Sequence, residues 1–171
     1  MKKSPIALIN PPAPFLIEER VFPNLGIINV ATSLKKKGYD VKIYDLSGEK
    51  DASQKMKEIA NEYSLIGFSS TSPQFLETYK LFKVSKEINA HANYFIGGAH
   101  ASAVLSFRSR ANSERIKKDS NILPLEEFDY VFGGEGDFLE DQLFLSGPKW
   151  KKLDLVQRLD DIPIPDRNLI D

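Results

Sequence analysis

Residues 65–73 read LIGFSSTSP: a short apolar run that ends in four hydroxyl-bearing residues and a proline. Apolar runs of this length, bounded by turn-forming residues, are typical of strands buried in a parallel sheet. The same arrangement recurs at residues 93–100 (NYFIGGAH) and 130–136 (YVFGGEG). In all three places small or polar residues follow the strand at once. The sequence therefore predicts strands whose carboxyl ends lead into open loops.

Two more strands and four helices are predicted around this centre. Strands are expected at residues 5–9 and 41–46, and helices at 24–37, 51–63, 73–89 and 137–145. Strands that alternate with helices are typical of βαβ units, whose crossovers are almost always right-handed. We therefore expect an α/β fold: a flavodoxin-like, doubly wound, five-stranded parallel sheet, Rossmann-like in outline. Residues 104–127 give the weakest pattern and are expected to form one helix and a loop.

The composition excludes several classes of protein. The 171 residues carry a net charge of −1 with lysine and arginine dispersed, so no nucleic-acid partner is expected. The absence of cysteine rules out disulfides, thiolate zinc sites and cysteine-bound iron–sulfur clusters. No apolar run approaches the roughly 20 residues of a membrane-spanning helix, and the amino terminus lacks a signal-peptide core. We expect a cytoplasmic protein with no membrane partner.

The polar and glycine residues gather where the strands end. Carboxyl ends of parallel strands meet at one edge of the sheet, where open α/β folds bind ligands, so one site is expected there. Residues 69–72 supply hydroxyl groups, while Gly97-Gly98 and Gly133-Gly134 expose backbone that a large ligand can approach closely. No nucleophile–base pair accompanies them. The site is expected to bind a ligand, and no catalytic or metal-ligating residue is predicted.

Each of these features also has a simpler interpretation. The hydroxyl cluster before Pro73 is equally consistent with a helix N-cap, the paired glycines with tight turns, and His100 with a loop hydrogen bond. The negative charge of Glu135 would stabilise the amino terminus of a following helix through the helix dipole. Neither a P-loop nor a dinucleotide-binding glycine motif is present, whereas a flavin site stays possible on the fold alone.

Seven short motifs occur in a fixed order along the chain: NPP at 10–12, PNLG at 23–26, KGYDV at 37–41, SST at 69–71, GGAH at 97–100, DYV at 129–131 and GEG at 134–136. Together they resemble the amino-terminal cobalamin-binding domain of B12-dependent radical SAM proteins. Residues 159–167, LDDIPIPDR, resemble the linker that leads from that domain into the radical SAM barrel. The resemblance implies a cobalamin-binding domain at residues 1–147 and a linker at 148–171.

The resemblance also implies which residues contact the cofactor. The serines after the third strand would face the nucleotide tail of the corrinoid, and the glycines would let that tail pass close to the backbone. The loop at residues 10–26 would lie against the corrin, and the loop near Gln74 and Phe75 would cover the lower face of cobalt. The full set of expected contacts is Asn10, Pro11, Pro12, Leu25, Gly26, Ser69, Ser70, Thr71, Ser72, Gln74, Phe75, Gly97, Gly98, Ala99, His100, Gly134, Glu135 and Gly136.

Two absences shape the expected function. No histidine lies between residues 10 and 26, so cobalamin is expected to bind base-off with no histidine on cobalt. The three-cysteine cluster motif of the family is missing, so this chain is not expected to complete a reaction alone. The resemblance implies a parent protein that binds a [4Fe–4S] cluster and S-adenosylmethionine, and that acts as a methyltransferase or a related radical enzyme. The radical SAM domain would be supplied in cis or in trans.

Two other functions stay open on the sequence. The chain is also consistent with a flavodoxin-like domain that binds another cofactor, such as flavin. A non-catalytic protein-interaction domain whose groove holds no ligand is the remaining alternative.

Overall fold

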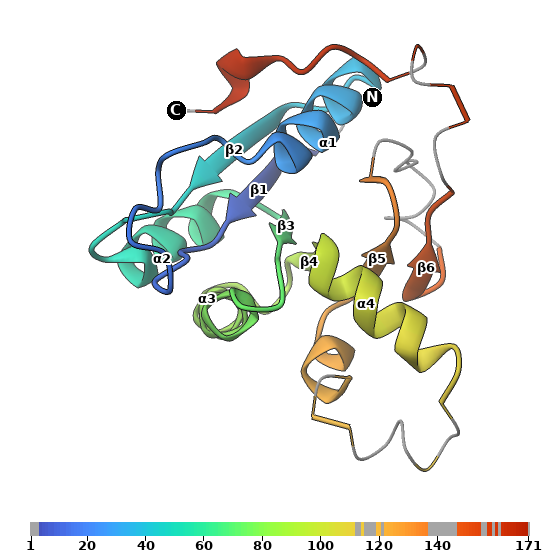
Figure 1. The fold of residues 1–171 in the computed structure, drawn as a ribbon. Helices are drawn as coiled ribbons and strands as arrows, with labels where there is room; N and C mark the ends of the chain where they lie inside the picture. Colours follow the sequence, from blue (N-terminus) through green and yellow to red (C-terminus); the bar gives the residue numbers. More distant parts are fainter. Residues whose placement is uncertain are drawn as a thin grey trace.

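In the computed structural model, the chain forms one parallel sheet with helices on both faces (Figure 1). The structure describes residues 4–111, 114, 119–120, 122–136, 147–154, 157–158, 160 and 162–170. The strands are β1 (Ile6–Asn10), β2 (Val41–Asp45), β3 (Leu65–Ser69), β4 (Asn93–Gly97), β5 (Tyr130–Gly133) and β6 (Trp150–Lys152). Their order is β2-β1-β3-β4-β5-β6, and all neighbours are parallel. This is the flavodoxin-like order, so the predicted doubly wound α/β fold is confirmed.

The predicted number of strands is corrected from five to six. The additional strand, β6, extends the sheet beyond β5, with Trp150 beside Val131 and Lys152 beside Gly133. It lies in the segment that the sequence assigns to a linker. The apolar pattern missed β6 because the strand is three residues long and two of them are exposed lysines. Short strands carrying lysine are common at sheet edges, where they discourage pairing with other chains.

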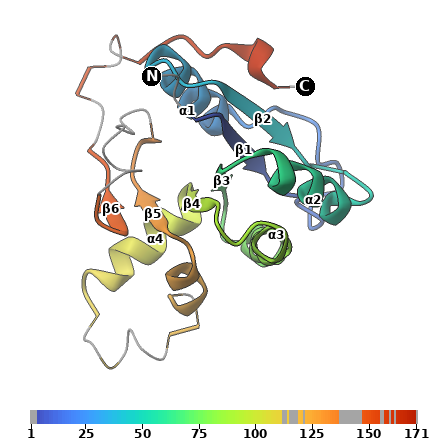
Figure 2. The same cartoon turned by 180° about the vertical axis from the view of Figure 1, so that it is seen from behind.

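The helices form two layers. Helix α1 (Leu25–Lys36) covers one face of the sheet, and α2 (Ala52–Glu62) and α3 (Phe75–Ile88) cover the other (Figure 2). The strands therefore carry apolar residues on both sides, and β1 is buried along its whole length. Asn24 caps α1 by accepting a hydrogen bond from the Ile27 amide at 3.3 Å. No helix in the described part of the chain is both long and apolar enough to cross a membrane.

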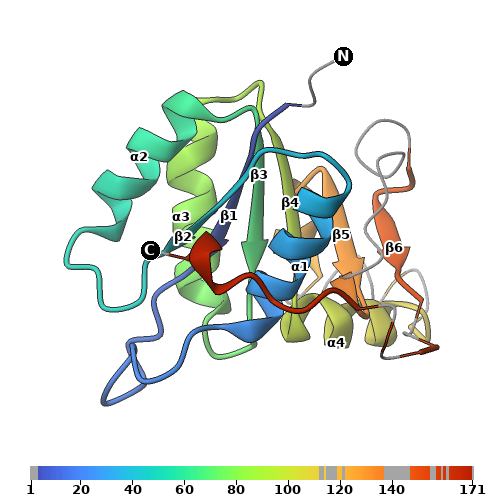
Figure 3. The same ribbon diagram turned by 90° about the horizontal axis from the view of Figure 1, so that it is seen from above.

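A fourth helix, α4 (Ala99–Arg108), lies across the carboxyl ends of β4 and β5 (Figure 3). It begins directly after Gly98, five residues earlier than the helix predicted within residues 104–127. Small residues dominate its first two turns, so the sequence shows little helical periodicity there. A short 3₁₀ helix, η1 (Leu123–Glu127), follows before β5. The helix predicted at residues 137–145 lies outside the described residues.

The end of the chain packs against α1. Residues 162–170, which include the 3₁₀ helix η5 (Arg167–Leu169), run along this helix (Figure 1). The Asp166 amide donates to Thr32 Oγ1 at 2.9 Å, and the Asp166 carboxylate accepts from Lys35 Nζ at 2.9 Å. The hydrogen bond from Lys35 lowers the pKa of Asp166. Leu169 and Ile170 pack against the apolar core on this face.

Candidate cofactor site

The floor of the site is set by the register of three central strands. Leu8 lies beside Gly67, and Gly67 lies beside Phe95, so all three face α1. A Cβ atom on Gly67 would come within 2.1 Å of the Phe95 ring. The ring therefore lies over bare backbone. Phe132 meets Phe95 edge to face, with ring centroids 6.0 Å apart, and extends the aromatic floor.

A cavity of about 270 Å³ lies above this floor, between the sheet and α1. Its lining includes residues of both β1 and β3, between which strand order reverses, and doubly wound sheets bind ligands at such a point. We call it the α1 cavity. Its lining residues are Leu8, Gly26, Ile27, Asn29, Val30, Phe68, Ser69, Phe95, Gly97, Gly98, Phe132, Gly134, Glu135, Gly136 and Leu153.

The two glycines after β4 have different roles. Gly98 has φ +92°, and a Cβ atom there would lie 2.7 Å from the Ser70 carbonyl oxygen, so only glycine fits. It brings the loops after β3 and β4 together, and the His100 amide donates to that same carbonyl at 3.0 Å. A Cβ atom on Gly97 would meet nothing closer than the Phe132 carbonyl oxygen at 3.7 Å. Gly97 therefore leaves open space above the floor.

The four hydroxyl-bearing residues after β3 point in different directions. Ser69 lines the α1 cavity. Ser70 is buried and bonds to Thr78 Oγ1 at 2.9 Å, while Thr71 Oγ1 donates to Gln74 at 2.8 Å. Helix α3 starts at Phe75 without a side-chain cap, so the N-cap interpretation of the cluster is wrong. Most of these hydroxyls hold the loop together, and one of them faces the cavity.

Two amide side chains tie the loops of the site to each other. Asn10 is buried, donates to Asp45 at 2.8 Å and to Ser47 at 3.0 Å, and accepts from Asn24 at 2.9 Å. It therefore joins β1, the loop after β2 and the amino terminus of α1. Gln74 Nε2 donates to the Pro11 carbonyl at 3.1 Å, which links the loops after β1 and β3.

His100 lies away from the α1 cavity, in a groove between α3 and α4. Its ring stacks on Phe75, with centroids 4.0 Å apart, and its Nδ1 lies 3.1 Å from Ser72 Oγ. Burial lowers the pKa of His100, so the ring is neutral at pH 7. We call this hollow, of about 560 Å³, the α3–α4 groove. Its lining residues are Ser72, Pro73, Phe75, Leu76, Tyr79, His100, Ala103, Val104, Phe107, Asp119, Ser120 and Pro124.

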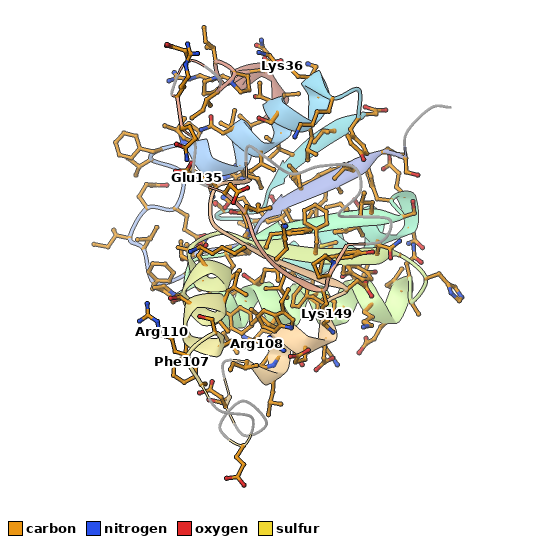
Figure 4. The ribbon with its side chains drawn as sticks, turned by 90° about the vertical axis from the view of Figure 1, so that its right-hand side faces the viewer. Lys36, Phe107, Arg108, Arg110, Glu135 and Lys149 are labelled. Carbon is orange, nitrogen blue, oxygen red and sulfur yellow. The ribbon has the colours of Figure 1, made fainter. Side chains whose placement is uncertain are left out.

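The charges near the two hollows also differ. Among the described residues, Glu135 is the one carboxylate that lines the α1 cavity, and Figure 4 shows it beside α1. On the α4 side of the sheet, Arg108 and Lys149 lie together and both pair with Glu126. The described residues include no group of three histidine, cysteine or acidic side chains that could hold a metal ion. The α1 cavity is thus an apolar hollow with few charges.

Comparison with known proteins assigns this architecture to a family. Residues 19–111, more than half of the chain, match the model of the B12 binding domain. The chain belongs to the B12-binding domain family. The matched residues run from the loop before α1 to the end of α4 and include most of the α1 cavity.

Two relatives extend the comparison. Over 99% of its length the chain is 26% identical to the uncharacterized methyltransferase PH0819 of Pyrococcus horikoshii, and it spans 39% of that protein. Two structures of the radical SAM methyltransferase TsrM from Kitasatospora setae align with 16% identity, one with TM-score 0.49 and one with 0.47. They cover 74% and 72% of this chain, which spans 27% of each. One contains tryptophan substrate and aza-SAM, and the other contains cobalamin and a [4Fe–4S] cluster.

The residues of this B12-binding domain suit one part of cobalamin. The α1 cavity is too small for a corrin ring, but it suits a planar aromatic base that enters over Gly97 and contacts Phe95 and Phe132. Neither histidine lines the cavity: His100 lies in the α3–α4 groove, and His91 is exposed before β4, at the opposite end of the sheet.

The structure divides the residues expected to contact cofactor into three places. Asn10, Ser70 and Gln74 are buried in hydrogen bonds that hold the loops, while Pro11 is buried, Pro12 half-buried, and Leu25, Thr71 and Ala99 exposed. Ser72, Phe75 and His100 line the α3–α4 groove. The residues that line the α1 cavity are Gly26, Ser69, Gly97, Gly98, Gly134, Glu135 and Gly136.

Sequence reasoning missed the apolar floor and the wall that α1 provides. Leu8, Phe95 and Phe132 look like ordinary core residues of buried strands, so nothing in the sequence separates them from the rest of the core. Asn29 was missed although its spacing from Gly26 places both on one side of a helix. A polar residue on that side of a core-facing helix is the signal that could have found it.

Proposed function

We propose that this chain binds cobalamin, with the nucleotide tail of the cofactor in the α1 cavity and the corrin outside it, at the carboxyl edge of the sheet. The observation that carries the proposal is the α1 cavity itself, in a chain of the B12-binding domain family. Its aromatic floor and the bare backbone at Gly97 favour a flat, apolar group.

The corrin would lie against the loop at residues 13–25, which contains the most exposed apolar side chains near this edge. Ile17 and Phe22 are almost fully exposed, and Phe15 and Val21 are half exposed. Exposed apolar groups gathered on one loop are typical of a binding surface. A corrin ring would cover them and remove their apolar area from water.

We further propose that cobalamin binds base-off, with no protein histidine on cobalt. The positions of both histidines support this proposal: His91 lies at the opposite end of the sheet, and the buried His100 ring is held in the α3–α4 groove by Phe75 and Ser72. The loop around Gln74 and Phe75 is the segment proposed to cover the lower face of cobalt. Its geometry is fixed by the hydrogen bond from Gln74 to Pro11 and by the stacking of Phe75 on His100.

The parent protein is proposed to be a B12-dependent radical SAM methyltransferase. The name of the Pyrococcus relative supports methyl transfer, although this chain spans 39% of that relative. The [4Fe–4S] cluster and S-adenosylmethionine would be held by a radical SAM domain, since this chain has no cysteine. Cobalamin supplies the methyl-carrying chemistry when bound, and the residues of this chain hold and orient it.

The test is to mix the purified chain with hydroxocobalamin under anaerobic conditions, remove free cofactor by desalting, and record the visible spectrum. Retention of one corrinoid per chain with a base-off spectrum is the expected result. A parallel sample with flavin mononucleotide is expected to lose its colour on desalting. A colourless protein in the first sample would contradict cobalamin binding by this chain, and a base-on spectrum would contradict the base-off proposal alone.

A further inference from the structure

Asn29 is a polar residue in the wall of an otherwise largely apolar cavity. It lies on the second turn of α1, between Ile28, which packs into the core, and Val30, which also lines the cavity. Its Oδ1 atom is buried and has no hydrogen-bond partner among the residues that the structure describes. Buried polar groups are nearly always hydrogen-bonded, because an unpaired one loses its bonds to water without replacement.

Within the part of the chain that the structure describes, the position of Asn29 has no structural explanation. The other amides of the site, Asn10, Asn24 and Gln74, each hold two segments of the chain together. Asn29 makes no such link among the described residues, and an apolar residue of similar size, such as leucine, would leave no unpaired polar group in the cavity wall. A side chain that is costly for the fold at a ligand cavity indicates a role toward the ligand.

The hydrogen-bonding atoms of the Asn29 side chain indicate which groups the ligand must carry. The unpaired atom, Asn29 Oδ1, is an acceptor, so the ligand must bring an N–H or O–H donor to it, and the exocyclic amine of a heterocyclic base is such a donor. The floor of Phe95 and Phe132 suits the faces of such a base, and Asn29 stands at the wall, where the edge of the base would lie. Neither a phenolic ring nor dimethylbenzimidazole, which has no N–H once it is joined to ribose, carries a donor for this oxygen.

We propose that Asn29 selects the lower base of the corrinoid, favouring a base with an exocyclic amine, such as adenine, over dimethylbenzimidazole or a phenolic base. This inference rests on the proposed cobalamin binding and adds to it the residue that reads the nucleotide tail. Asn29 is a specificity-determining residue and touches no reacting atom.

The test measures affinities by equilibrium dialysis for the full chain and for Asn29→Leu. Three corrinoids are used: a cobamide with an adenine lower base, hydroxocobalamin, whose dimethylbenzimidazole has no N–H donor, and dicyanocobinamide, which lacks the nucleotide. Asn29→Leu is expected to weaken binding of the adenine cobamide about 5- to 30-fold, the usual cost of one lost buried hydrogen bond. Binding of dicyanocobinamide is expected to stay unchanged, and binding of hydroxocobalamin is expected to stay unchanged or improve.

Two controls keep the test decisive. Asn61→Leu places the same change on the exposed surface of α2 and is expected to leave all three affinities as they are. Asn29→Ala repeats the measurement with a smaller side chain, should leucine disturb the fold as judged by circular dichroism. An equal ratio of adenine-cobamide affinity to hydroxocobalamin affinity in the full chain and both Asn29 variants would overturn the inference alone. Failure of the unmodified chain to retain any corrinoid would overturn the proposed function together with it.

Discussion

The α1 cavity and the α3–α4 groove lie on opposite faces of the sheet, near the same edge, and they are built from different kinds of residue. Glycines and apolar side chains make the cavity, and its wall carries Asn29, whose Oδ1 has no hydrogen-bond partner among the described residues. Aromatic rings and His100 make the groove, where Phe75 stacks on the imidazole and Ser72 bonds to it. The comparison teaches that polar motifs after a strand can hold loops in place, while the neighbouring glycines leave the space for a ligand.

The largest effect on stability is expected at Gly98, which brings the loops after β3 and β4 together. Gly98→Ala places a Cβ atom at positive φ and against the Ser70 backbone, so it is expected to destabilise the fold by about 3 kcal/mol. That loss corresponds to a fall in Tm of roughly 6–12 °C. Thermal unfolding followed by circular dichroism measures it. The matched control is Gly97→Ala, where the Cβ atom has room; equal losses at the two positions would contradict the different roles assigned to them.

A substitution that fills the α1 cavity tests cofactor binding and is expected to leave the stability of the fold nearly unchanged. Gly97→Leu directs an apolar side chain into the α1 cavity and is expected to keep Tm within a few degrees while weakening hydroxocobalamin binding by more than about 30-fold, or about 2 kcal/mol. Dialysis gives the affinity and circular dichroism the stability. A matched variant in the other hollow, Ala103→Leu, is expected to bind cobalamin normally. Reversal of the two results would move the proposed site into the α3–α4 groove.

Removing the Asn10 side chain tests whether it has a structural role. Asn10→Ala leaves Asp45 and Asn24 without their shared partner, which is expected to cost about 1.5 kcal/mol of unfolding free energy. Urea denaturation measures this cost. Asn61→Ala, on the exposed surface of α2, is expected to change stability by less than about 0.5 kcal/mol. An Asn10 variant as stable as the original would leave direct contact with a ligand as the remaining role.

The smallest effect is expected from the protonation of His100. Burial lowers its pKa in the folded state, so as pH falls through the ordinary value of about 6.5 the unfolded chain takes up the proton first. The contribution of neutral His100 to the free energy of unfolding is therefore complete above about pH 6.5 and is lost as the pH falls below that value. His100→Asn is expected to reduce the loss between pH 7.5 and 5.5 by less than about 1 kcal/mol. Urea midpoints at the two pH values measure it, and an equal change of midpoint with pH in both proteins would mean that folding does not lower the pKa of His100.

The fold was accessible from sequence because its strands and first three helices carry strong local signals. Buried runs such as LIGF, the Asn24 cap and Gly38 after α1 act within a few residues of each other. The strand β6 was not accessible, because three residues of an edge strand carry almost no pattern. Helix α4 was placed too late, because its small residues hide the face that packs on β5.

The sequence predicts where the site lies in the fold, but it does not predict which side chains line the interior of the cavity. The sequence indicates the sheet edge and the glycines, because both follow from where strands end. Whether Ser69 or Ser70 faces a ligand depends on the pleat of β3 and on Thr78, which lies on another element. The floor of Phe95 and Phe132 depends on strand register, which is set by the whole sheet.

Helix α1 is held at both of its ends. Asn24 binds Asn10 at one end, and Thr32 and Lys35 bind Asp166 near the other. The wall of the α1 cavity therefore has its shape before any ligand arrives. A group entering it does not have to fix a loose helix, so the entropic penalty of association comes mainly from the ligand's own flexible tail. Protease susceptibility of α1 should accordingly be nearly the same with and without a bound corrinoid.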